Sequence, residues 1–442
     1  MDRFLQSIEY LESLMGKERD KDRTAGMRRM NALLDEMGDP YRAYPTVHVG
    51  GTAGKGSTSM MLAEMLRNSG FRTGLHVSPH LEDIRERMQV DSKFMTEAEF
   101  ADLVDYLRPV VERVRRAGGC GWPSYFEVLL AITFEHFKRK KVDIAVIEVG
   151  MGGKYDGSNV IKPYVAVLTN VGLDHTEYLG DTVERIAMEK VGIFKGGIDV
   201  LTGVDQPSVI RIVEDAARDE GCTLFRLGKD IQYRQVEFRK SSMKFDLEFE
   251  GKKYDNIILG ALGEHQVRNA SLAFSAAARL RNHGIQIRES TARETLREIR
   301  LPGRFEALGR NPTVIIDGAH NPMKMHALSE TLRRFYRPKT LKTVFAASKT
   351  KDIANMLEII GGLTDQFYLT RFQAATDFGR KMACDPEELR EKTDIRSMTF
   401  DDAPAAYEEA VRDAGANGTV CITGSLYLVG ELRTYIKNRA KP

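Results

Sequence analysis

The stretch "TVHVGGTAGKGSTSMMLAEMLRNSG", residues 46–70, decides the fold class. A short β-branched run leads into glycines, and a segment with helical spacing follows and ends at Gly70. A strand, a glycine-rich loop and a helix N-terminus present free backbone N–H groups to an anion. Gly51, Gly54 and Gly56 permit close backbone approach and positive φ. The stretch therefore predicts a phosphate-binding loop at the edge of an α/β sheet.

The loop departs from the common phosphate-binding pattern G-x-x-x-x-G-K-[ST]. Val49 stands where the first glycine of that pattern belongs, and Gly56 separates Lys55 from the first hydroxyl, Ser57. Lys55 can still reach terminal phosphates, and Ser57 or Thr58 can ligate Mg²⁺ or a phosphate oxygen. The alternative, a glycine-rich turn beside an ordinary surface lysine, is disfavoured by the strand before the loop and the helix after it.

Composition limits the classes of protein that fit. A length of 442 residues suggests roughly two or three domains, and a formal net charge of +2 gives no basic surface for nucleic acid. The four cysteines form no Cys-x-x-Cys pair, which argues against a zinc ribbon or a disulfide framework. No apolar run approaches the ~18 residues of a membrane span, and the acidic start is unlike a signal peptide. We expect a soluble, cytoplasmic enzyme without nucleic-acid or membrane partners.

Strand-like runs alternate with helical patterns along most of the chain. "RTGLHV", "VDIAVIEVG" and "YVAVLTNVG" are predicted to be further buried strands, with helices at about 97–117 and 126–141. Residues 231–259 alternate apolar and polar positions, which predicts antiparallel strands. A second series of strands and helices begins near residue 300. The pattern predicts two α/β domains with mostly parallel sheets, residues 1–297 and 298–442.

Polar residues follow the predicted strands, at the sheet edge where α/β proteins bind ligands. Glu148 closes an apolar strand, where a carboxylate is unfavourable unless it is paired or bound to a metal. Asp174 and His175 follow another strand, and histidine is a common metal ligand. "SPHLEDIRER", residues 78–87, adds a serine, a histidine and two arginines suited to anions. A helix-capping glutamate, a hydrogen-bonded loop histidine and a solvated loop remain open alternatives for these three features.

The second half offers weaker local signals. "GRFE" contains Arg304, and "DGAHNP" contains Asp317 and His320, but Asp-Gly marks a turn in any protein. Lys190 is predicted from its local pattern to be a surface lysine on a helix. Taken together, the residues favour ATP·Mg²⁺ chemistry at a domain interface, which leaves kinases, NTPase switches and ligases open. The basic loop at 78–87 favours a ligase, because it could hold an anionic acceptor for in-line attack on the γ-phosphate.

The ordered motifs resemble those of the Mur ligase superfamily, and within it the folylpolyglutamate synthase and dihydrofolate synthase family. That family's loop reads G-T-x-G-K-G-[ST], and "GTAGKGS" is similar to it. Further similar motifs, in family order, are "SPHL..IRER", "EVGMGG.YD.SN", "GLDH...LG", "IA.EK.GI.K", "HQ..NA..A", "PGRFE", "DGAHNP" and "GSLYLVGE". The resemblance implies a phosphate-loop central domain of Mur ligase type with a small antiparallel sheet, followed by a Rossmann-like domain.

The resemblance also implies a set of site residues. ATP would be held by Thr52, Ala53, Gly54, Lys55, Gly56, Ser57, Asn269, Arg304, Asp317 and His320. Mg²⁺ would be bound by Ser57, Ser78, Glu148 and His175, with two Mg²⁺ ions and a monovalent cation expected. Catalytic roles would fall to Lys55, His175 and Lys190, the last carrying a carbamate. The pterin pocket would be lined by Ser124, Tyr125, Phe126, Tyr155, Asp156 and Gly157.

The implied reaction is acyl-phosphate ligation. A carboxylate of a pterin or folate acid attacks the γ-phosphate of ATP, and the amino group of L-glutamate then attacks the acyl phosphate. The C-terminal domain would supply the amino-acid site and close over the intermediate, because water would hydrolyse it. A monomer is expected.

Three departures from the family pattern leave alternatives open. Ala53 replaces an asparagine, and "KYDGSN" at 154–159 replaces R-x-D-A-T-N. A basic segment expected after the third C-terminal strand is replaced by "TRFQAATDFGRKMACDPEEL", in which Arg371 could serve. A ligase of the same mechanism that joins another acid and amino acid is therefore a second hypothesis. A nucleotide-binding regulator or kinase without ligation is a third.

Overall fold

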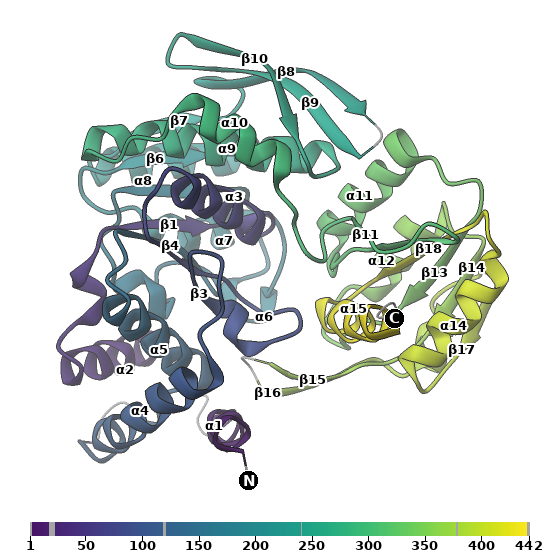
Figure 1. Cartoon of the computed structure of the whole chain (residues 1–442), viewed down its shortest axis with the longest axis horizontal. Coiled ribbons are helices and arrows are strands. Elements are labelled where there is room, and N and C mark those ends of the chain that lie inside the picture. The colour runs from purple at the N-terminus through teal and green to yellow at the C-terminus, as the bar shows by residue number, and fades with distance from the viewer. Residues whose placement is uncertain (1, 17–22, 118–120, 240, 377–378, 440–442) are drawn as a thin grey trace.

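The computed structural model describes residues 2–16, 23–117, 121–239, 241–376 and 379–439. Figure 1 shows two α/β lobes side by side, with a small antiparallel sheet above the N-terminal lobe. The predicted fold class, two mostly parallel sheets with an antiparallel piece, is confirmed. No helix in these ranges is long and apolar enough to cross a membrane.

The first sheet has seven strands in the order β3-β2-β4-β1-β5-β6-β7. Its neighbouring strands run parallel except for β2 and β3. β1 lies at the centre and is buried along its whole length, as expected for a strand covered on both faces. The strands are β1 (Thr46–Gly50), β2 (Thr73–His76), β3 (Met88–Val90), β4 (Ile144–Glu148), β5 (Val165–Leu168), β6 (Asp199–Thr202) and β7 (Thr223–Arg226).

Helices cover both faces of this sheet because successive strand side chains point in opposite directions. On β4, Ile144 and Val146 belong to the apolar core formed with α3 and α9, whereas Ala145 and Ile147 pack with α4 and α5. The helices of this lobe are α1 (Arg3–Glu12), α2 (Arg23–Glu36), α3 (Lys55–Asn68), α4 (Glu97–Ala117), α5 (Tyr125–Arg139), α6 (Thr176–Leu179), α7 (Val183–Lys190), α8 (Pro207–Asp219), α9 (Glu264–Arg279) and α10 (Glu289–Glu298).

The antiparallel sheet matches the alternating pattern predicted for residues 231–259. It consists of β8 (Ile231–Arg239), β9 (Ser242–Phe249) and β10 (Lys252–Leu259), in the order β10-β9-β8. Alternate residues of β9 are buried, and its apolar side packs against α9 in the core shared with the first sheet. The small sheet therefore extends the core of the N-terminal lobe.

The second lobe is built on a six-stranded sheet in the order β11-β12-β18-β13-β14-β17, with only β11 antiparallel to its neighbour among the pairings described. Its strands, with the separate β15–β16 pair, are β11 (Glu306–Ala307), β12 (Thr313–Ile316), β13 (Leu341–Phe345), β14 (Gln366–Leu369), β15 (Gln373–Thr376), β16 (Gly379–Met382), β17 (Ser397–Thr399) and β18 (Thr419–Thr423). Its helices are α11 (Pro322–Glu330), α12 (Ile353–Gly361), α13 (Pro386–Arg390), α14 (Ala403–Ala414) and α15 (Leu426–Arg439). The division at residue 298 stays a prediction.

Candidate active site

The glycine-rich loop joins the central strand β1 to the start of α3. Gly54 has φ +83° and Gly51 has φ +142°, conformations that other residues rarely adopt. A Cβ at Gly51 would overlap the Thr169 hydroxyl, and one at Gly54 would overlap the Asn269 amide. These glycines are needed because β5 and α9 approach the loop backbone closely. α3 begins at Lys55 without a side-chain cap, so its first N–H groups face the cavity.

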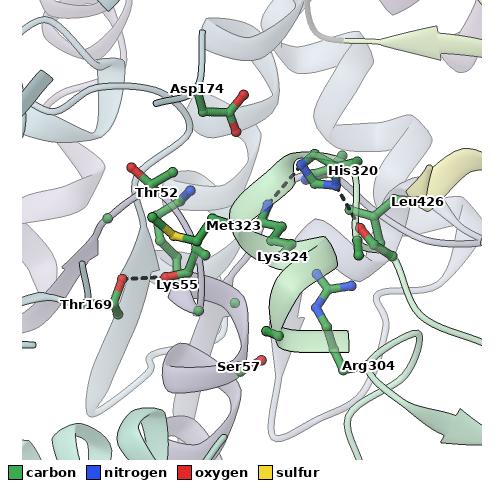
Figure 2. A pocket seen from close by; sticks show the side chains of 18 of the residues that line it. Thr52, Lys55, Ser57, Thr169, Asp174, Arg304, His320, Met323, Lys324 and Leu426 are labelled. Atoms are coloured by element: carbon green, nitrogen blue, oxygen red, sulfur yellow. Dashed lines mark hydrogen bonds between the residues drawn. The ribbon is translucent and has the colours of Figure 1, made fainter. Parts of the chain in front are cut away.

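The loop is held from the end of β5. Thr169 Oγ1 donates to the carbonyl of Ala53 at 2.6 Å, and Thr169 lies beside the loop in Figure 2. The Ala53 N–H donates to Asn170 Oδ1 at 2.9 Å, and Asn170 Nδ2 donates back to the Ala53 carbonyl at 3.0 Å. Both backbone polar groups of Ala53 are therefore bound by neighbouring side chains, which fixes the loop although residue 53 has only a methyl group.

Glu148 ends β4 next to the loop, in register with Val49 of β1. Its side chain is buried, it accepts one hydrogen bond from the Ser78 N–H at 3.2 Å, and Lys55 Nζ lies 3.9 Å away. Burial raises the pKa of Glu148, and Lys55 offsets part of that effect. A buried carboxylate with this little compensation, facing a cavity, suits a bound cation.

Ser57, Ser78 and His175 line the same cavity as Glu148. The described residues contain no cluster of three His, Cys, Asp or Glu side chains able to hold a metal on their own. Mg²⁺ is usually bound by one or two carboxylates together with substrate phosphates and waters. The donor set of one carboxylate, two hydroxyls and an imidazole beside a phosphate loop therefore fits Mg²⁺ held jointly with a nucleotide.

Lys190 lies at the end of α7 and is only 4% exposed. The local sequence pattern predicted a surface lysine, but the chain folds this turn of helix against the loop, and Lys190 Nζ donates to the Gly51 carbonyl at 2.9 Å. Burial, with the charge of Lys55 as the next contribution, lowers the pKa of Lys190 to about 7. A large fraction of this amine is therefore neutral at physiological pH.

The second lobe closes the cavity from the opposite side. Arg304 and His320 line it (Figure 2), together with Asp317 and with Asn269 from α9. Asp317 is buried and accepts hydrogen bonds from the N–H groups of Phe305 and Ala319, both at 2.9 Å. Fourteen of the residues expected at the site are thus gathered in one cavity: Thr52, Ala53, Gly54, Lys55, Gly56, Ser57, Ser78, Glu148, His175, Lys190, Asn269, Arg304, Asp317 and His320.

Contacts between the lobes include residues that the sequence did not single out. Lys351 Nζ forms an ion pair with Asp174 Oδ1 at 2.6 Å, and Asn321 Nδ2 donates to Asp174 Oδ2 at 3.0 Å. Met323 at the start of α11 occupies the space beside Gly172. Asp174 follows β5, whereas the residues that meet it come from the second lobe. Sequence spacing gives no signal for such pairs.

Lys324 also lines the cavity and was not predicted. It stands four residues after His320, and its Nζ lies 2.8 Å from His320 Nε2 (Figure 2). A helical turn beginning at Asn321 after "DGAH" would have placed Lys324 beside the predicted site, so the signal was present in the spacing.

The six residues expected to line the acceptor pocket lie outside this cavity: Ser124, Tyr125, Phe126, Tyr155, Asp156 and Gly157. Ser124 caps α5, where its hydroxyl accepts from the N–H of Glu127 at 3.2 Å. Asp156 is buried and accepts from the N–H of Met151 at 2.8 Å and from the N–H of Ser158 at 3.0 Å. In this structure Asp156 therefore braces the glycine turn at 150–153 that forms part of the cavity wall.

Tyr125 instead borders a second cavity between α1, the segment 80–84 and α15. Phe372 and Tyr427 border both cavities, with ring centroids 5.6 Å apart. Arg371 lines only the second cavity, where it pairs with Asp401 at 2.7 Å. The aromatic pair is therefore part of the wall of both cavities.

The cavity brings a phosphate loop, a buried carboxylate and a buried lysine of the first lobe against the second lobe, which fits an enzyme that uses ATP between two lobes. Comparison with known proteins assigns this enzyme to the ATP-dependent ligases of Mur type. The Mur ligase middle domain model matches residues 125–277, and the model of the dihydrofolate synthetase C-terminal domain matches residues 304–435. The two models match residues of both lobes, and the phosphate loop lies before the first match.

Individual relatives narrow this class. The chain is 32% identical to the dihydrofolate synthase/folylpolyglutamate synthase of Bacillus subtilis, over 93% of this chain and 95% of that protein. It is similar to the Mycobacterium tuberculosis folylpolyglutamate synthase solved with ADP, with TM-score 0.89, 29% identity and 98% of each chain covered. It is also similar to an Escherichia coli relative solved with DHPP and ADP, with TM-score 0.86, 28% identity, and 99% of this chain and 98% of that one covered. The chain belongs to the dihydrofolate synthase/folylpolyglutamate synthase family.

Proposed function

We propose that this enzyme uses ATP to ligate L-glutamate to dihydropteroate, to a folate, or to both. The observation that carries the proposal is the joint cavity, in which Lys55, Glu148 and Lys190 of the first lobe face Arg304 and His320 of the second. Relatives that this chain matches over nearly its whole length are named for this activity, and one of them was solved with both ADP and DHPP. A nucleotide-binding regulator or kinase without ligation is disfavoured, because the chain belongs to a family of ligases.

The site residues divide into roles by position. The loop from Thr52 to Ser57 holds the phosphates, with Lys55 over the terminal ones, while Arg304 and Asn269 hold the rest of the nucleotide. Glu148, Ser78 and His175 hold Mg²⁺, which when bound neutralises charge on the transferring phosphoryl group. The lysine and the helix N-terminus stabilise the same charge from fixed positions.

The chemistry then has two steps. A carboxylate oxygen of the acid attacks the γ-phosphorus, the bond to the β-phosphate oxygen breaks, and ADP and an acyl phosphate form. The neutral amine of glutamate attacks the acyl carbon, and inorganic phosphate leaves with the bonding pair of the acyl–oxygen bond. The nitrogen loses one proton as the amide forms, and the released phosphate takes up that proton. The interlobe contacts of Asp174 with Lys351 and Asn321 keep the two lobes together over the intermediate and exclude water.

Lys190 has a second part in this proposal. Its neutral amine can react with CO₂ to give a carbamate, which would convert a cation near Lys55 into an anion able to hold a second Mg²⁺. The lowered pKa and the burial of Lys190 support this modification. A monovalent cation, a monomeric state and a cytoplasmic location stay predictions of the sequence.

The test is an ADP-release assay with dihydropteroate and with tetrahydrofolate, each with and without glutamate. ADP formation that requires both the acid and glutamate, with an amide product by mass spectrometry, is the expected result. ADP release indifferent to both substrates would refute the proposal.

A ligase for another acid is the second candidate, favoured by Ala53 and by the altered segment 154–159. In the structure, Lys154 lies over the Tyr155 ring, with its Nζ 5.3 Å from the ring centroid, so the segment keeps the charge of the family pattern but differs from it in its side chains. A panel of carboxylic acids and amino acids, followed by phosphate release, separates the candidates; activity on pterin acids alone would eliminate this one.

A further inference from the structure

Lys324 is a lysine of the cavity to which the proposed function gives no role. It lies in the first turn of α11 and is half-buried, with its amine directed at His320 (Figure 2). His320 Nδ1 lies 2.7 Å from the Gly318 carbonyl, so Nδ1 carries the proton and Nε2 accepts from Lys324 at 2.8 Å. Among the residues that the structure describes, no carboxylate lies within ion-pair distance of Lys324 Nζ. Its hydrogen-bond partner is therefore a neutral imidazole.

The charges around Lys324 come from both lobes. Lys55, Arg304 and Lys351 line the same cavity. Among acids, Asp174 raises the pKa of Lys324 most, although Asp174 is already paired with Lys351. The charge of Lys324 in turn lowers the pKa of three other groups in the cavity, Lys190, Glu148 and Asp317. Burial lowers the pKa of Lys324 to about 7; Asp174 opposes the shift, and the three neighbouring cations add to it.

An ammonium group in such surroundings gains little from its present partner. A neutral imidazole offers one lone pair, whereas an oxyanion offers several and also compensates the neighbouring cations. An anion that enters the cavity would therefore displace His320 as the partner of Lys324.

We propose that Lys324 binds an oxyanion of the bound ligand, either a phosphate of the nucleotide or acyl phosphate or the carboxylate of the incoming amino acid, and exchanges His320 for it when the site fills. The inference rests on the proposed function for the identity of the amino acid, but nucleotide binding alone can test its phosphate form. Lys324 would then be a second positive charge, besides Arg304, that the second lobe contributes to the reacting centre.

The experiment compares the full-length enzyme with Lys324→Met and Lys324→Arg. Lys349→Met is the matched control, because Lys349 is an exposed lysine that pairs with Glu388 outside the cavity. Calorimetry gives the Kd of Mg·ADP and of a non-hydrolysable ATP analogue, and the ADP-release assay gives kcat and the KM for glutamate. Melting temperatures confirm that each variant is folded.

We expect Lys324→Met to weaken one of the two binding constants by tenfold or more, and Lys324→Arg to restore it to within about threefold of the wild type. A change in the nucleotide Kd identifies the phosphate as the partner, and a change in the KM for glutamate with an unchanged nucleotide Kd identifies the carboxylate. Lys349→Met should leave both constants unchanged.

A second readout separates binding from a packing role. At pH 8, titrations in buffers of different ionisation enthalpy should show that ligand binding by the wild type takes up part of a proton, and that Lys324→Met takes up less. Equal proton uptake, with both constants and kcat within twofold of the wild type, would overturn the proposal. If the wild type makes no ADP with any acid, the proposed function fails, and direct titration of the nucleotide and of glutamate still decides the role of Lys324.

Discussion

Replacing Glu148 with glutamine should abolish the function of the site and stabilise the folded protein at the same time. The carboxylate is 4% exposed, has one hydrogen bond at 3.2 Å, and its nearest cation, Lys55, is 3.9 Å away. If it binds Mg²⁺, glutamine removes a unit charge from the metal. Two unit charges at about 4 Å attract by roughly 4 kcal/mol, and Mg²⁺ has twice the charge and lies about 2 Å from an oxygen that binds it. Even after water replaces the carboxylate, the affinity for Mg²⁺ should therefore fall by at least about 100-fold.

The stability of the metal-free protein should change in the opposite direction. Burial raises the pKa of Glu148 above its unfolded value, so the folded state is penalised once the carboxyl ionises. The penalty is absent below the unfolded pKa of about 4.3 and fully present above the folded pKa. Glutamine lacks this penalty, so Glu148→Gln should melt at a higher temperature than the wild type near pH 8, and the difference should vanish as the pH falls toward about 4.

Two measurements check this reasoning. Thermal melts in EDTA at several pH values give the stability, and ADP release against the Mg²⁺ concentration gives the metal dependence. Glu135→Gln is the control, since Glu135 is buried but pairs with Arg139 at 2.7 Å and lies outside the cavity. A lower melting temperature of Glu148→Gln near pH 8, with unchanged Mg²⁺ dependence, would show that Glu148 only stabilises the fold.

Three further changes test other parts of the site. Burial lowers the pKa of Lys190 to about 7, so the neutral fraction of its amine rises between pH 6 and pH 8. The carbamate content, measured by ¹³C NMR with ¹³CO₂, should rise over the same range and should be absent in Lys190→Met. Asp174→Asn should lower kcat/KM by tenfold or more with little loss of ADP affinity, because Asp174 pairs with Lys351 across the lobes. A double-mutant cycle with Lys351→Met should give a coupling energy of roughly 1–3 kcal/mol. Additive effects would show that this ion pair does not hold the lobes together. Gly54→Ala places a methyl group against the amide of Asn269 at positive φ, so ADP affinity should fall at least tenfold and the melting temperature should fall with it. Because Asn269 is itself assigned to nucleotide binding, the rescue is measured on stability: Asn269→Gly should partly restore the melting temperature of Gly54→Ala if steric overlap is the cause.

Much of the fold followed from the sequence because the signals were local. The loop after β1 was predicted from three glycines and a lysine between a strand and a helix, and Gly51 and Gly54 do adopt the backbone conformations that glycine permits. The alternation at 231–259 predicted the antiparallel strands because burial there has a period of two residues.

The tertiary surroundings of single residues could not be predicted in this way. Lys190 lies on a polar-looking helix turn, and only the close packing of α7 against the loop buries it. The pairing of Asp174 with Lys351 joins positions 177 residues apart, for which one sequence contains no periodic signal. The residues predicted to line the pterin pocket are a further example. Asp156 accepts hydrogen bonds from the backbone of its own loop, and its part in substrate binding stays a prediction.

The position of β1 has a consequence for how such an enzyme can change. β1 is paired on both sides, by β4 and β5. The loop that follows it is therefore attached to a central strand that resists local unfolding. The residues that meet the loop from the second lobe are attached to a separate sheet and reach it through a few polar contacts. Hydrogen exchange should therefore be slowest along β1 and much faster in α11. If the second lobe holds the amino acid, as proposed, its preference can change by substitutions in that lobe alone, without altering the loop attached to β1.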